Sequence, residues 1–181
     1  CTSTSERLDP DQVVSLLNRY LERMTRGSMQ QGGDINEYIG DAILAVFATA
    51  HEAVAAAVEM QRALEELRSQ TDDEEVRNLK MRIGVHFGDV VEGNIGTDER
   101  VKFGVVGDTV NTAARIQDKS REGKHTCILV SEVTKDNAER FEYEMIGALP
   151  MKGKSLPVRV YEVISMPPPS SKDPPPPSSK A

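Results

Sequence analysis

The sequence lacks the features that mark secreted and membrane-embedded proteins. Its 181 residues include only two cysteines, Cys1 and Cys127, which cannot form a disulfide framework and therefore favour a reducing compartment. No apolar run approaches the roughly 20 residues of a membrane span, and no secretory signal peptide is recognisable. We therefore expect a cytoplasmic protein, or the cytoplasmic domain of a larger protein that is itself soluble or membrane-bound.

The sequence also lacks an excess of positive charge. Acidic residues number 29 and basic residues 22, giving a formal net charge of −7. This balance argues against nucleic acid as a partner. An acidic protein that handles a polyanion must concentrate positive charge locally or use a metal ion. The chain is long enough for one globular domain with a full core.

Proline is scarce until the C-terminal end. Residues 167–180 read PPPSSKDPPPPSSK and hold seven of the ten prolines, so we expect a folded domain over 1–165 and a disordered Pro/Ser-rich tail over 166–181. A ligand for an SH3-type domain is the alternative for this tail. The first residue is cysteine, not methionine, so we expect a fragment or processed piece of a longer chain.

The remaining sequence predicts an α+β fold, with one sheet covered by helices. Capping and turn residues and apolar spacing set the expected bounds, among them a capping box at Thr49 and Glu52, Asp108 as a helix cap, and Tyr20 among the apolar positions of the first helix. We expect helices over 9–27, 49–68 and 108–120 and from Ser131, an acidic loop over 71–75, two strands within 81–96 joined at 87–89, and further strands at 34–39, 42–47, 101–108, 127–130, 141–148 and 157–164.

Two carboxylates stand in an otherwise apolar hairpin sequence. Asp41 follows Gly40 between the two predicted strands, where it is either part of a tight turn or a metal ligand at the hairpin tip. Glu37 lies four residues earlier, either on an exposed strand edge or in a pocket.

Three further polar side chains are candidates for anion binding. Asn111 and Arg115 are four residues apart and share one face of the predicted helix; an exposed polar stripe is the alternative. Lys152 precedes Gly153 in a loop before the last strand. Glycine permits close approach to a ligand, and a solvated turn is the alternative.

Four stretches of the sequence read GGDINEYIGDAILAVF, MRIGVHFGDVVEGNIG, FGVVGDTVNTAAR and MKGKSLPVRVYEV. Together and in this order, they resemble the catalytic domain of class III nucleotidyl cyclases, the adenylate/guanylate cyclase family, in its bacterial homodimeric form. The resemblance extends over about residues 1–164. It implies a ferredoxin-like βαββαβ-type domain whose central, mostly antiparallel sheet is covered by helices.

The resemblance also implies a reaction and a site. Family members convert a nucleoside triphosphate to a 3′,5′-cyclic nucleotide and pyrophosphate for signal transduction, with two Mg²⁺ or Mn²⁺ ions in each site. Asp41 would bind metal, Asn111 the ribose, Arg115 the charge developing at phosphorus, and Lys152 the terminal phosphates. The active sites would lie at the interface of a homodimer.

Glu37 and Gly104 match the two family positions that select the purine base. Guanine presents N1–H and a 2-amino group, and a carboxylate accepts from both, whereas adenine presents an acceptor at N1. Gly104 offers room without a hydrogen-bonding group. These residues favour GTP over ATP.

The first metal carboxylate of the family is not matched in these residues, because the resemblance begins just after the opening strand that carries it. We therefore expect the chain as written to bind metal weakly and to cyclise slowly. The alternative function is a non-catalytic cyclase-homology module that dimerises, binds nucleotide and regulates a partner.

Overall fold

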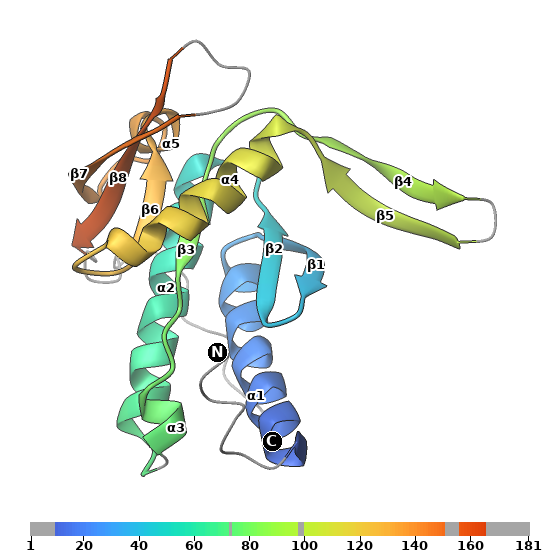
Figure 1. Cartoon of the computed structure of the whole chain (residues 1–181), viewed down its shortest axis with the longest axis vertical. Coiled ribbons are helices and arrows are strands. Elements are labelled where there is room, and N and C mark those ends of the chain that lie inside the picture. Colours follow the sequence, from blue (N-terminus) through green and yellow to red (C-terminus); the bar gives the residue numbers. More distant parts are fainter. Residues whose placement is uncertain (1–9, 73, 98–99, 151–155, 166–181) are drawn as a thin grey trace.

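The computed structural model describes residues 10–72, 74–97, 100–150 and 156–165, and it confirms the predicted α+β class (Figure 1). The helices are α1 (Pro10–Gln30), α2 (Ala50–Ser69), α3 (Glu74–Arg77), α4 (Asp108–Lys119), the 3₁₀ turn η1 (Ser120–Glu122) and α5 (Glu132–Asp136). The strands are β1 (Asp34–Ile39), β2 (Ala42–Val46), β3 (Ile83–Val85), β4 (Val91–Thr97), β5 (Arg100–Val106), β6 (Ile128–Ser131), β7 (Glu142–Leu149) and β8 (Val158–Ser165). None of the described helices is both long and apolar enough to cross a membrane.

A four-stranded sheet in the order β3-β6-β8-β7 is the largest sheet among the described residues. β3 and β6 are parallel, and the other two pairings are antiparallel. Alternate residues of β6 face opposite sides, as strand geometry requires. Ile128 and Val130 pack with Val54 of α2, while Leu129 packs with Ile116 of α4. Helices therefore cover both faces of this sheet.

The hairpin β1–β2 lies beside α1 (Figure 1). Its turn contains Gly40 at φ +61°, a left-handed conformation that glycine adopts without a steric penalty. On the side of α1, the hydroxyls of Thr25 and Tyr38 are hydrogen-bonded at 2.8 Å. This contact ties the first strand of the hairpin to the helix.

Helix α1 does not end at Gly27, as its sequence suggested, but continues to Gln30. Gly27 is buried, and a Cβ atom there would lie 3.5 Å from Met60 Cγ of α2. This glycine serves close packing of two helices and not helix termination. The chain reverses direction instead at Gly32, where φ is +79°.

The start of α2 follows the predicted capping box. Thr49 Oγ1 accepts a hydrogen bond from the amide of Glu52 at 3.2 Å, and Glu52 Oε2 accepts one from the amide of Thr49 at 3.0 Å. Two amides that the first helical turn would leave unpaired are thereby satisfied.

Strands β2 and β3 share a core without pairing with each other. Ile43 of β2 and Ile83 of β3 both pack against the buried cluster of Met24, Leu64 and Met81. Within the described part of the chain, no ladder of hydrogen bonds joins these two strands. The hairpin β4–β5 forms a separate two-stranded sheet that extends away from the four-stranded sheet, while β5 keeps contacts with β1 and α4 (Figure 1).

The prediction of two strands joined at 87–89 is confirmed by β3 and β4, which enter different sheets because β3 pairs with β6 and β4 pairs with β5. Two other local predictions were wrong. Asp108 is not the cap of α4; the cap is Gly107, with no side-chain hydrogen bond. The acidic run 71–75 is not all loop, since Glu74 begins α3, which places Val76 in the core.

The loop that follows α4 and η1 is organised around one buried carboxylate, Glu162 of β8. Its two oxygens accept hydrogen bonds of 2.8–2.9 Å from the four consecutive backbone amides of residues 124–127. Burial raises the pKa of this carboxyl, but the four amides outweigh that effect and lower the pKa below its ordinary value. The ionised carboxylate therefore holds the loop.

We expect Glu162→Gln to destabilise the fold by about 2 kcal/mol at neutral pH, the scale of hydrogen bonds to a charged group. A group with a lowered pKa in the folded state stabilises the protein above its ordinary pKa of 4.5, and this contribution is lost as the pH falls through the lowered value. Thermal unfolding from pH 7 to pH 3 should therefore show the difference between the wild type and the variant shrinking on the acid side. A difference independent of pH would contradict this account.

Candidate functional site

Helix α4 presents two of the predicted polar side chains on its exposed face. Asn111 and Arg115 are both exposed, whereas Thr112 and Ile116, one residue further along in each case, are fully buried. This alternation follows from the helical repeat, because residues four apart share a face. The prediction that Asn111 and Arg115 lie together on one helix face is confirmed by the position of the helix and the exposure of both residues.

Asp41 occupies the predicted position at the tip of the hairpin β1–β2, and it is exposed. Its carboxylate is near Tyr20 of α1. Burial first, and then the negative charge of Asp41, raise the pKa of the Tyr20 phenol to about 12. Tyr20 packs against the same core cluster as Ile43, so the tip of the hairpin is close to a part of α1 that is firmly packed.

The two residues expected to select the base lie on strands that contact each other. Glu37 is half-buried in β1, opposite Leu44, next to an irregularity in the pairing of β1 with β2. Gly104 is buried in β5, opposite Gly93 of the neighbouring strand. Strands β1 and β5 pack against each other, although they belong to different sheets. A carboxylate and a position without a side chain are thus carried by neighbouring strands.

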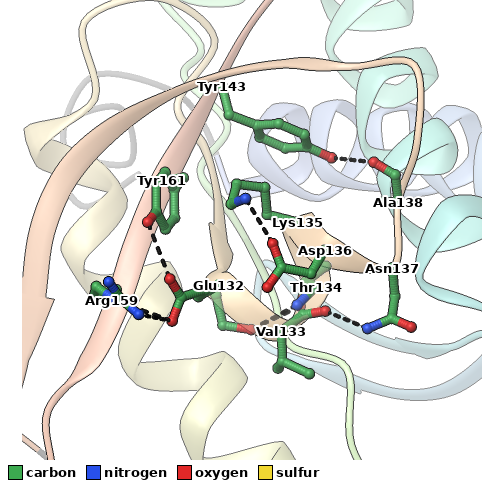
Figure 2. Close-up of polar contacts among 11 residues, drawn as sticks. Glu132, Val133, Thr134, Lys135, Asp136, Asn137, Ala138, Tyr143, Arg159 and Tyr161 are labelled. Carbon is green, nitrogen blue, oxygen red and sulfur yellow. Dashed lines mark hydrogen bonds and ion pairs between the residues drawn. The ribbon is translucent and has the colours of Figure 1, made fainter.

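Lys152 lies outside the described residues, so its prediction is not tested. The strands before and after it, β7 and β8, pair along their whole length. Figure 2 shows how the start of β8 is joined to α5. Arg159 donates to Glu132 with its Nε and Nη2 at 2.9 and 2.7 Å, and the Tyr161 hydroxyl is 3.3 Å from Glu132.

The described residues do not form one enclosed site. The turn of the hairpin β1–β2 points along α1, at a distance from α4 (Figure 1), so one chain does not bring Asp41 together with Asn111 and Arg115. Two open hollows lie elsewhere. One of about 930 Å³ runs beside α1 and Tyr38, and one of about 450 Å³ lies beside His51 and Arg140.

The donor set for a metal ion in the described residues is small. They contain no group of three or more His, Cys, Asp or Glu side chains that could hold an ion. The chemistry of Asp41 nevertheless fits Mg²⁺ or Mn²⁺, because such hard ions take oxygen ligands, and Mg²⁺ is commonly held by one or two carboxylates together with substrate phosphates.

A family model for the adenylate and guanylate cyclase catalytic domain matches residues 1–165. The chain belongs to this family. Among curated relatives, an adenylate cyclase of Anabaena cylindrica is 33% identical over 171 residues, which is 90% of this chain and 34% of that protein. A terminal-differentiation-specific adenylate cyclase of Dictyostelium discoideum is 31% identical, over 90% of this chain and 8% of that protein. This cyclase-family chain thus spans about a third or less of these relatives.

Solved structures agree with the family assignment. A guanylyl cyclase is 36% identical, with a TM-score of 0.72 over 92% of this chain and 88% of that chain. A bacterial light-regulated adenylyl cyclase is 28% identical, with a TM-score of 0.78 over 90% of this chain and 84% of that chain. The fold is therefore that of cyclase catalytic domains.

Sequence reasoning missed the environment of two residues that lie beside candidate site residues, Tyr20 near Asp41 and Thr112 next to Asn111. Tyr20 was read only as an apolar helix position, although its phenol lies near Asp41. Thr112 was not singled out, although its buried hydroxyl has no hydrogen-bond partner among the described residues. Neither property has a sequence signal, because both arise from packing between distant elements.

Replacing the unpaired, buried hydroxyl of Thr112 should stabilise the protein. Thr112→Val should raise the free energy of unfolding by about 1 kcal/mol, because it removes a buried polar group that lacks a partner and keeps the shape of the side chain. Thr134→Val is the matched control: Thr134 is equally buried, but its hydroxyl accepts from the Phe87 amide at 2.8 Å and should be costly to lose. Chemical denaturation of both variants gives the comparison; equal losses would contradict the assignment.

Proposed function

We propose that the protein is a guanylate cyclase domain, which converts GTP to 3′,5′-cyclic GMP and pyrophosphate in signal transduction. In this reaction the ribose 3′-oxygen attacks the α-phosphorus, the bond from that phosphorus to the bridging oxygen breaks, and pyrophosphate leaves. The hydroxyl proton passes to solvent or to a nearby base. The single observation that carries the choice of GTP is the half-buried carboxylate of Glu37 on a strand that packs against the strand of Gly104.

The base preference follows from hydrogen-bond chemistry. The Glu37 carboxylate accepts from N1–H and the 2-amino group of guanine, whereas the N1 acceptor of adenine would face it without a donor. Similar proteins carry the names of both activities. The 36% identical structure is a guanylyl cyclase and the Anabaena relative is an adenylate cyclase, so the preference for GTP rests on Glu37.

The phosphate end of the substrate requires positive charge in an acidic protein. Asn111 would orient the ribose, and Arg115 would stabilise the charge that develops at the α-phosphate, a role typically worth a few kcal/mol. Lys152 would contact the terminal phosphates. Asp41 would hold Mg²⁺ or Mn²⁺, two ions in each site in the family; when bound, they neutralise the phosphates and lower the pKa of the attacking hydroxyl.

A homodimer accounts for the separation of these residues in one chain. Asp41 lies at a hairpin tip away from α4, which carries Asn111 and Arg115 (Figure 1). A two-fold pair would place the tip of one copy against α4 of the other, and symmetry would generate two equivalent sites. A single copy would then be inactive.

Changing the charge at Glu37 should change the base preference. We expect Glu37→Lys, alone and combined with Gly104→Asp, to raise the ratio of kcat/KM for ATP over GTP by about 100-fold or more, since sites built on hydrogen bonds discriminate strongly. The control is Glu142→Lys, which makes the same charge change at an exposed position on β7. An unchanged ratio in the Glu37 variants would show that this residue does not read the base.

Mixing two inactive variants tests the shared site. Asp41→Ala and Arg115→Ala should each lose cyclase activity, while an equimolar mixture should recover about a quarter of the wild-type rate, because half of the dimers are mixed and each of these has one intact site. Subunit exchange is verified by fluorescence transfer between labelled copies. Exchange without recovery would contradict a site built from two chains.

A further inference from the structure

We propose that Gly84 and Thr109 are positioning residues that set where α4 lies, and thereby where Asn111 and Arg115 meet the substrate. This inference rests on the proposed function, because the role of these two α4 side chains comes from it. The position of α4 on the sheet is a feature of the described structure, and it can be measured without an activity assay.

Gly84 lies in the middle of β3, directly beneath the backbone of α4. A Cβ atom at this position would lie 2.3 Å from the amide nitrogen of Gln117 and 2.6 Å from the carbonyl oxygen of Ala113. Real Cβ atoms essentially never approach other atoms within 3.0 Å. Both obstructing atoms belong to the helix backbone, so a side-chain rotation cannot relieve the contact and the helix itself must move.

The contact lies opposite the functional face of the helix. Ala113 and Gln117 each lie two positions from Arg115 along the chain, and Ala113 is also two positions from Asn111. Ile116, on the buried side, packs with Leu129 and Val160 of the sheet. A methyl group at Gly84 would therefore lift this part of α4 from the sheet and displace Asn111 and Arg115 together.

Thr109 fixes the first turn of the same helix. Its hydroxyl donates to the carbonyl oxygen of Asp89 at 2.6 Å, in the segment between β3 and β4. This contact depends on Gly88, where a Cβ atom would lie 2.8 Å from Thr109 Oγ1. The cap residue Gly107 makes no side-chain hydrogen bond to α4. We therefore assign to the hydrogen bond of Thr109 the role of fixing the N-terminal end of the helix.

The position of α4 matters because catalysis depends on the placement of catalytic groups to within about one ångström. Misplacement of a catalytic group by about 1 Å can cost about 100-fold in rate. Relieving the contact at Gly84 requires a shift of this order, since 2.3 Å must grow to an ordinary separation above 3.4 Å. The loss should appear mainly in kcat, because Asn111 and Arg115 would act on the ribose and on charge formed in the transition state.

The main test is Gly84→Ala in the full chain. We expect a shifted α4 in its crystal structure, a fall in kcat of about 100-fold, and little change in KM for GTP. Gly27→Ala is the matched glycine control, because its methyl would lie 3.5 Å from Met60 Cγ, an ordinary contact. Val54→Ala, in the core on the opposite face of the sheet, controls for lost stability alone.

A double-mutant cycle with Arg115→Lys, which keeps the positive charge but loses the planar guanidinium, distinguishes positioning from general damage. If Gly84 acts through Arg115, Gly84→Ala should have a much smaller effect on kcat in the Arg115→Lys background than in the wild type. An equal effect in both backgrounds would overturn the inference. An α4 that does not move in the crystal structure of the variant would overturn it as well, whatever the activity.

Variants of Thr109 provide a second test of the proposal, which does not require that the Gly84→Ala protein folds. Thr109→Val should lower kcat, and Thr109→Ser, which keeps the hydroxyl, should retain wild-type kcat. Equal kcat values for the two variants would refute the role of this hydrogen bond. Failure of the proposed function has a different signature: the wild type would form no cyclic nucleotide from GTP or ATP, while the displacement of α4 in Gly84→Ala would still be observed.

Discussion

The contact between the backbone of α4 and Gly84 is the constraint on which the arrangement of the candidate site depends. It allows a helix to lie directly on a strand, at a separation that any Cβ atom would prevent. The buried side of α4 then packs with Leu129 and Val160, and its exposed side presents Asn111 and Arg115. The loop after the helix is held in turn by the buried carboxylate of Glu162, so the helix is fixed along its length.

The second constraint is the distance between the hairpin tip and this helix. An acidic chain that handles a triphosphate must gather cations and metal ligands locally, yet Asp41 and Arg115 lie on separate parts of one copy (Figure 1). In the proposed homodimer, assembly from two copies would resolve this conflict without moving either element. The packing of Tyr20 and α1 beside the hairpin tip would then hold Asp41 in place for the partner chain.

The elements that sequence reasoning predicted well carry their own local signals. The capping box of Thr49 and Glu52, the Gly40-Asp41 turn and the N-cap Ser131 each determine a conformation within a few residues. Glycine was harder to interpret. Gly27 lies inside a helix because Met60 packs there, and Gly107 takes the cap position expected for Asp108. In both cases a packing contact or a backbone conformation outweighed the local preference.

By itself the sequence determined the α+β class, the family and the polar side chains at the candidate site, because these depend on residue types at short, fixed spacings. Only the tertiary structure decided that β3 and β4 enter different sheets, that β1 packs against β5, and that Gly84 supports α4. The physical reason is that sheet partners and close backbone approaches are set by contacts between residues far apart in the chain. No spacing within a motif encodes them.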